Sequence, residues 1–175
     1  GQRPAESQAG DMTVTVRSAT PADLPAVRQV LVATWHATYD AIFGVAMVTD
    51  ITGRWHSLEA LRGQIDKAGT AFLVAERDGA VVATLYASPG RDGILMLDRL
   101  YVLPAMQGHG VGRALFETMR GRFPSTRMIR LEVEPRNAPA IAFYRRLGFA
   151  DAGQGTACGG DQAAAIAHLV MEKIL

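Results

Sequence analysis

The spacing of hydrophobic positions changes along the chain, and each spacing predicts one type of element. β-Branched residues dominate between Met12 and Arg17, which predicts a first strand. The segment Thr20-Pro21-Ala22-Asp23 is typical of a helix start, and apolar residues then recur at helical spacing to about Tyr39. Residues 40–56 show no clear period. Ser57 caps a predicted second helix.

The rest of the chain predicts most of a sheet and two more helices. Strands are expected at 71–77, 81–87, 94–102, 128–133, near 149–154 and from about 164 to 175. Helices are expected from about 110 to 123 and through Leu147 after a cap at Asn137, with Gly148 in the left-handed position that follows the second helix. The order predicts a single α+β domain, with a mixed, mostly antiparallel twisted sheet of six or seven strands and about four helices.

Composition narrows the function classes. The length of 175 residues fits one domain, and 49% hydrophobic with 20% charged residues is ordinary for a globular protein. A net charge of +1 predicts no nucleic-acid or membrane partner, and no stretch reaches the roughly 18 apolar residues that span a bilayer. The single cysteine, Cys158, favours a reducing, cytoplasmic location. Residues 1–11 are polar and predict a disordered tail before a domain over 12–175.

A glycine-rich turn between a predicted strand and helix carries the clearest chemistry. It reads Gln107-Gly108-His109-Gly110-Val111-Gly112, and successive N–H groups at such a helix start can hold a pyrophosphate. A triphosphatase loop would continue with Lys and Ser or Thr, but Arg113 and Ala114 follow here. The glycine spacing also differs from the dinucleotide fingerprint. A simple tight turn needs fewer glycines.

Two segments together resemble a known family. LDRLYVLPAMQGHGVGRALFETMR is similar to the cofactor-binding segment of the GNAT N-acetyltransferases, and LEVEPRNAPAIAFYRRLGF to the motif that follows it. The resemblance implies a GNAT fold over about 13–175, with acetyl-CoA as cosubstrate and no metal. It also suggests a homodimer.

The resemblance assigns residues to the cofactor. The pantetheine arm would pair with the main chain of Leu100 and Val102 and contact Asn137, and Tyr144 would protonate the leaving thiolate. The pyrophosphate would lie on the turn residues Gln107, Gly108, His109, Gly110, Val111, Gly112 and Arg113.

The base and the acceptor are less specified. An amine must lose a proton before it attacks the thioester, and Glu132 and Asp98 are alternative carboxylates, with Glu134 a weaker third. Trp35 and Tyr39 match a W-x-x-T/A-Y pattern of bacterial members and would wall the acceptor pocket. A small-molecule primary amine is the expected acceptor. The alternatives are a protein N-terminal acetyltransferase and a non-catalytic acyl-CoA sensor.

Overall fold

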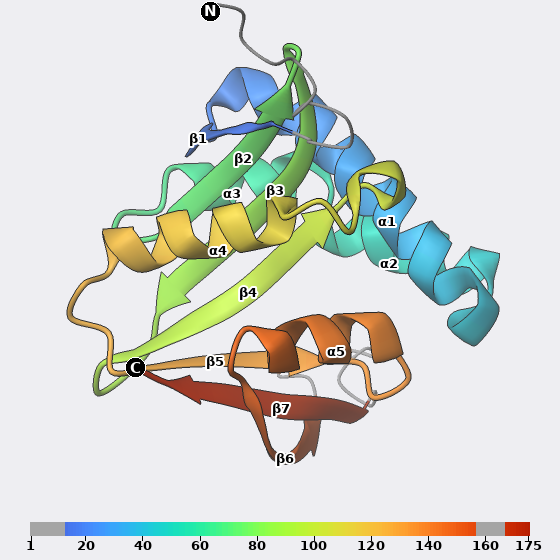
Figure 1. Ribbon diagram of the computed structural model, residues 1–175. Helices are drawn as coiled ribbons and strands as arrows, with labels where there is room; N and C mark the ends of the chain where they lie inside the picture. Colours follow the sequence, from blue (N-terminus) through green and yellow to red (C-terminus); the bar gives the residue numbers. More distant parts are fainter. Residues whose placement is uncertain (1–12, 157–166) are drawn as a thin grey trace, which may run out of the picture.

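A computed structural model describes residues 13–156 and 167–175 of the chain (Figure 1). The expected tail at 1–11 and Cys158 lie outside these residues. The strands of the described part are β1 (Thr15–Ser18), β2 (Ala71–Arg77), β3 (Ala80–Pro89), β4 (Ile94–Val102), β5 (Met128–Val133), β6 (Ala150–Thr156) and β7 (Ala167–Ile174). Its α-helices are α1 (Leu24–Phe43), α2 (Val45–Trp55), α3 (Leu58–Ile65), α4 (Val111–Arg122) and α5 (Ala138–Arg146).

The strands form one sheet in the order β1-β2-β3-β4-β5-β7-β6. Every neighbouring pair is antiparallel except β4 and β5. The predicted α+β class and the mostly antiparallel mixed sheet are therefore confirmed. The predicted bounds of β2, β4 and β5 are those of the structure.

The helices cover the two faces of the sheet separately. Along β2, Leu73 and Ala75 pack in the cluster that holds α4 and α5, whereas Phe72 and Val74 pack with α1 and α3. This alternation is the period of two expected of a strand buried on both faces. The core thus lies in two layers, with the sheet between them (Figure 1).

One helix was not predicted. α2 fills the 40–56 segment and buries Val48, Ile51 and Thr52 against α1, where Trp35 and Tyr39 complete the cluster. Gly44 begins it with a φ of 89° and no side-chain cap, so the usual polar start signal is absent. α1 also runs past the expected Tyr39 to Phe43. Among the described residues, no helix is long and apolar enough to cross a membrane.

β4 and β5 diverge, and this divergence creates the site. Their parallel pairing covers only Ile94–Met96 of β4 and Met128–Arg130 of β5. Asp98 adds one unpaired residue to β4 opposite β3, because Tyr86 pairs with Arg99 while Ala87 pairs with Leu97. Such a bulge bends and twists its strand. Beyond the bulge, the β5-facing edge of β4 is left without a neighbouring strand (Figure 1).

Candidate active site

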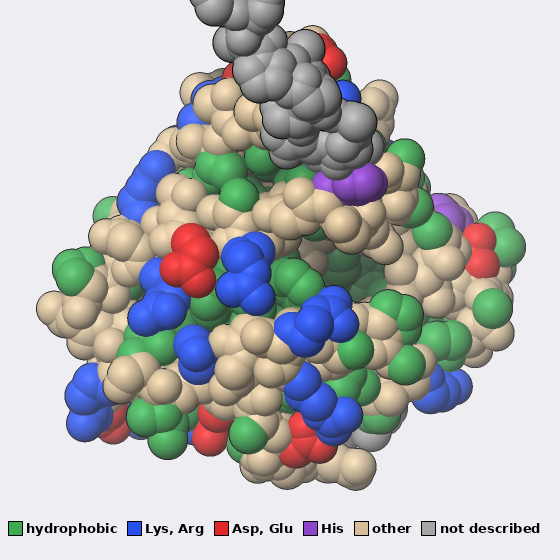
Figure 2. All heavy atoms as spheres, in the orientation of Figure 1, with side chains coloured by type: hydrophobic (Ala, Val, Ile, Leu, Met, Phe, Trp, Pro, Cys, Tyr) green, Lys and Arg blue, Asp and Glu red, His purple; other side chains and the backbone are tan. Residues whose placement is uncertain are grey.

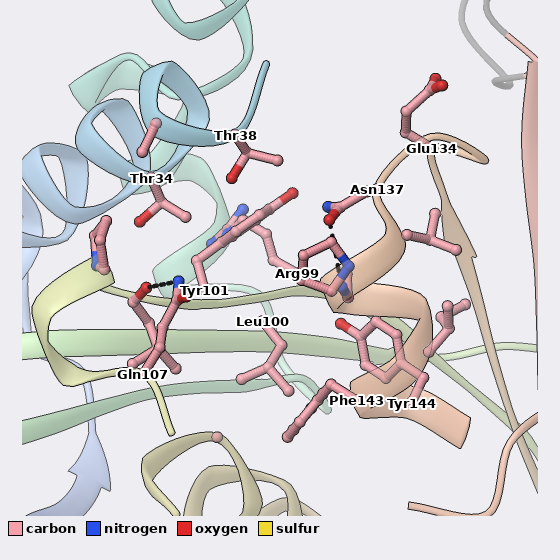
Figure 3. Close-up of a pocket in the computed structure, with 18 of the residues that line it drawn as sticks. Thr34, Thr38, Arg99, Leu100, Tyr101, Gln107, Glu134, Asn137, Phe143 and Tyr144 are labelled. Atoms are coloured by element: carbon pink, nitrogen blue, oxygen red, sulfur yellow. Dashed lines mark hydrogen bonds between the residues drawn. The ribbon is translucent and has the colours of Figure 1, made fainter. Parts of the chain in front are cut away.

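A cavity of about 810 Å³ occupies the gap between the diverging strands. Its walls come from α1, the second half of β4, the glycine turn, the end of β5 and α5. Figure 3 draws Thr34 and Thr38 of α1 on one side and Asn137, Phe143 and Tyr144 on the other, with Leu100 of β4 between them. In the space-filling view the same face is hollowed, with Lys and Arg side chains at its rim (Figure 2).

The glycine turn presents backbone donors to this cavity. Gly108 and Gly110 have φ values of 82° and 83°, in the left-handed region that residues with a Cβ rarely adopt. Gly110 is the N-cap of α4, and the first bond of that helix runs from Ala114 N to Gly110 O at 3.0 Å. The preceding N–H groups of α4 therefore have no partner within the helix. They and the positive end of the helix dipole favour an anion.

The third glycine has a different reason. Gly112 lies inside α4, and a Cβ there would stand 2.9 Å from Cζ of Phe143. Phe143 belongs to α5 and also lines the cavity. Gly112 thus permits the close packing of α4 against α5 rather than a special turn conformation.

The turn is tied to the strand before it. Gln107 Nε2 donates to Val102 O at 2.9 Å, a bond drawn in Figure 3. Leu100 and Val102 line the cavity from the edge of β4 that lacks a partner strand. An extended ligand with amide groups could pair with this edge as a strand would.

Tyr144 lies on the cavity side of α5 and is 8% exposed. Its ring packs at 5.3 Å from Phe143 and 5.6 Å from Phe149, measured between ring centroids. Burial raises the pKa of the Tyr144 hydroxyl well above its ordinary value. The hydroxyl is therefore protonated at neutral pH, which is the state that a proton donor needs.

Three carboxylates line the cavity in different surroundings. Asp98 stands at the bulge and accepts a hydrogen bond of 2.6 Å from Ser88 Oγ. It keeps contact with solvent, yet desolvation by the surrounding protein raises its pKa. Glu132 is an exposed residue of β5. Glu134 is buried and accepts from Arg136 Nε at 2.7 Å, so it is engaged in an ion pair.

Asn137 joins the two sides of the cavity. Its Oδ1 accepts from Ala140 N at 3.3 Å and so caps α5, as predicted. Its Nδ2 donates to Tyr39 Oη at 3.1 Å. The residue expected at the cofactor and the residue expected at the acceptor are thus in direct contact.

Most of the predicted site residues meet in this cavity, with two exceptions. His109 of the turn and Trp35 of α1 are not among its lining residues. Trp35 packs behind Tyr39, at 4.5 Å between ring centroids, and against Trp55 and His56. The cavity also includes residues that were not predicted, and the polar ones among them include Thr34, Arg99, Tyr101, Arg136 and Arg146. For Arg99 the available signal was a charge within the apolar run 94–102.

The residues present fit coenzyme A. The unpaired edge of β4 suits the amides of a pantetheine arm, and the amides of the turn suit a pyrophosphate. Arg113, Arg136 and Arg146 add positive charge to the lining. Within the described residues, no group of three or more His, Cys, Asp or Glu residues could hold a metal ion.

Comparison with known sequences agrees with this geometry. The model of the acetyltransferase (GNAT) family matches residues 31–149. Phosphinothricin N-acetyltransferase of Alcaligenes faecalis is 27% identical over 146 residues, which are 79% of this chain and 71% of that protein. IAA acetyltransferase of Azospirillum brasilense is 35% identical over 112 residues, 62% of this chain and 71% of that protein. Two mycothiol acetyltransferases are matched over only about a third of their own length.

A solved structure has the same fold. The PaiA N-acetyltransferase of Thermoplasma acidophilum, in complex with coenzyme A, superposes with a TM-score of 0.81 over 94% of this chain and 100% of that one. The sequences are 21% identical, so this likeness concerns the fold. Because the family model matches more than half of the chain, the chain belongs to the acetyltransferase (GNAT) family of N-acetyltransferases, which use acetyl-CoA as cosubstrate.

Proposed function

We propose that this protein transfers the acetyl group of acetyl-CoA to the primary amine of a small molecule, by direct attack of the amine on the thioester. One observation carries the proposal: a single cavity is lined by the glycine turn, the open edge of β4, Tyr144 and the carboxylates of Asp98 and Glu132. The named activities of the relatives on phosphinothricin and IAA support a small acceptor.

The cosubstrate supplies an activated acetyl group and a thiolate leaving group. In this proposal, the turn amides and Arg113 hold the phosphates, and the backbone of Leu100 and Val102 holds the arm beside Tyr144. The Tyr144 hydroxyl gives its proton to the thiolate sulfur. Its raised pKa keeps the proton in place until the leaving group develops negative charge.

The amine must lose a proton before or during attack, and Asp98 and Glu132 are the candidates to accept it, directly or through water. Glu134 is excluded from the proposal, because its carboxylate already pairs with Arg136. Desolvation raises the pKa of Asp98, which makes its carboxylate a stronger base than an ordinary aspartate. The variants Asp98→Asn and Glu132→Gln should therefore differ in activity. The larger fall in kcat is expected for the residue that takes the proton.

The test is a thiol-release assay with acetyl-CoA against polyamines, amino acids, phosphinothricin, aminoglycosides and peptides with free N-termini. We expect turnover with a small amine. When both substrates are varied, the double-reciprocal plots of initial rate should give intersecting lines, as direct attack in a ternary complex requires. Parallel lines would instead indicate an acetylated enzyme intermediate. Turnover confined to peptides would favour the protein N-terminal alternative. Tight acetyl-CoA binding without any turnover would favour a sensor.

A further inference from the structure

Arg99 is a buried arginine of β4 whose hydrogen-bonding capacity is largely unused. The residue is 7% exposed, and Nη1 donates to Gln64 Oε1 at 2.7 Å. Nε and Nη2 are also buried and have no hydrogen-bond partner. None of the ion pairs found among the described residues includes Arg99. Two N–H-bearing atoms of a charged group thus lack an acceptor.

The guanidinium of Arg99 stays charged but has no ion-pair partner in its surroundings. The guanidinium lies 5.1 Å from the ring centroid of Phe72 and 5.0 Å from that of Tyr86. Burial lowers its pKa to about 10, so it stays charged at neutral pH. A buried charge without an anionic partner is costly to a folded protein. Asp98, its neighbour in β4, attracts the charge electrostatically but makes no hydrogen bond to it, and Asp98 Oδ2 accepts from Ser88 Oγ instead.

Other donors without partners accompany Arg99. Thr34 Oγ1 is buried, has no hydrogen-bond partner, and belongs to a residue that lines the same cavity as Arg99 (Figure 3). His56 Nδ1 is also buried and unpartnered, and burial together with the charges of Arg99 and Arg28 lowers the His56 pKa to about 3. The imidazole is therefore neutral and can offer one N–H. These groups offer donors, and no carboxylate of the described residues accepts a hydrogen bond from Arg99.

Arg99 faces the acceptor side of β4. Leu100 and Val102 pack toward the cluster that holds α4 and α5, whereas Tyr101 packs toward α1. Arg99 lies over Phe72 and Tyr86, which belong to the α1 and α3 layer. The phosphates of the cofactor have their own donors at the start of α4, so Arg99 is not needed for them.

We propose that the acceptor amine carries a carboxylate, and that Arg99 binds this carboxylate through Nε and Nη2 with help from the Thr34 hydroxyl. These two guanidinium nitrogens lie on one edge of the planar group and match the two oxygens of a carboxylate. The inference rests on the proposed function and narrows its substrate class to amino acids and similar amino carboxylates. Arg99 then sets acceptor specificity.

The test compares substrate pairs that differ by the α-carboxylate: leucine with 3-methylbutylamine, and phenylalanine with phenethylamine. Because the carboxylate also changes the pKa of the amine, the measure is the effect of Arg99→Gln on each kcat/KM. We expect a loss of about 10- to 150-fold for the amino acids, the range of a hydrogen bond to a charged group, and little loss for the plain amines. Arg99→Lys should retain an intermediate preference. Arg54→Gln, on the exposed face of α2, serves as the control.

A binding measurement makes the test independent of turnover. Titration calorimetry of N-acetylleucine and N-acetylphenylalanine into the CoA-loaded protein should show binding that Arg99→Gln weakens by a similar factor. Unchanged CoA affinity of the variant shows that it is folded. If binding depends on Arg99 while no amine is acetylated, the anion site stands and the proposed function fails. If plain amines are acetylated and Arg99→Gln affects both members of a pair equally, or if neither acetylated acid binds, the carboxylate site is wrong.

Discussion

Replacement of Asn137 by alanine should destabilise the protein and loosen the contact between α1 and α5. Two interactions are lost at once: the cap to Ala140 N and the bond from Nδ2 to Tyr39 Oη. Loss of an N-cap costs about 1 kcal/mol. A hydrogen bond between uncharged groups contributes about 1 kcal/mol net. The expected total is about 2 kcal/mol, because Tyr39 is only 5% exposed and water replaces the bond poorly.

The assay is urea denaturation followed by circular dichroism, with thermal melting as a second readout. For a chain of this length, about 2 kcal/mol corresponds to a fall in Tm of roughly 4–8 °C. Asn137→Ser keeps a good capping oxygen but is too short to reach Tyr39, so it should lose only about half of the total. Tyr39→Phe removes the same bond from the other side.

The double variant decides whether the bond across the cavity exists. If Asn137→Ser and Tyr39→Phe act on one interaction, their combined loss should fall short of the sum of the single losses by about 1 kcal/mol. Strict additivity would refute the contact between α1 and α5. A change of less than about 0.5 kcal/mol in Asn137→Ala would refute the reasoning as a whole, since surface substitutions commonly lie within that range.

Three further predictions concern other parts of the fold. Gly112→Val should lower the free energy of unfolding in urea by about 1–3 kcal/mol through overpacking against Phe143, and Phe143→Leu should relieve part of that loss. The hydrogen bond from Arg17 lowers the pKa of Asp23 from 3.8 to about 2. As the pH falls, the unfolded state therefore binds the proton first, and stability should fall between about pH 4 and pH 2. Thermal melts at a series of pH values should show a smaller fall for Asp23→Asn. If Asp98 is the base, kcat/KM should rise with pH through a pKa above 3.8, and Asp98→Asn should lack this limb; an unchanged profile would leave Glu132 as the candidate.

Local signals in the sequence predicted most of the elements. The Ser57 cap and the Asn137 cap act within a few residues, and the structure has both of them. α2 was not predicted because its start lacks a polar cap, and because Gly53 and two threonines weaken its helical preference. It is stable because Val48 and Ile51 pack against α1, which is a tertiary effect.

The site depends on features that a sequence pattern does not carry. The run 94–102 predicts a strand, but neither the bulge at Asp98 nor the end of the pairing with β5 after Met96 follows from that run. Both arise from how the strand packs between two layers. The same holds for Arg99, whose burial over two aromatic rings comes from β2 and β3. The residues of the glycine turn could be named from the sequence motif alone. The residues on the α1 side of the cavity, such as Arg99 and Thr34, could be found only from the fold.

The most direct test of the account is acetyl transfer by the Tyr144→Phe variant, measured by thiol release beside its affinity for CoA. Phenylalanine keeps the ring between Phe143 and Phe149 and removes only the hydroxyl. With the best acceptor found for the wild type, we expect kcat to fall by about 10²- to 10⁴-fold, the usual contribution of a general acid, and the Kd for CoA to stay unchanged. Wild-type turnover in Tyr144→Phe would contradict the claim that this cavity protonates the leaving thiolate through Tyr144.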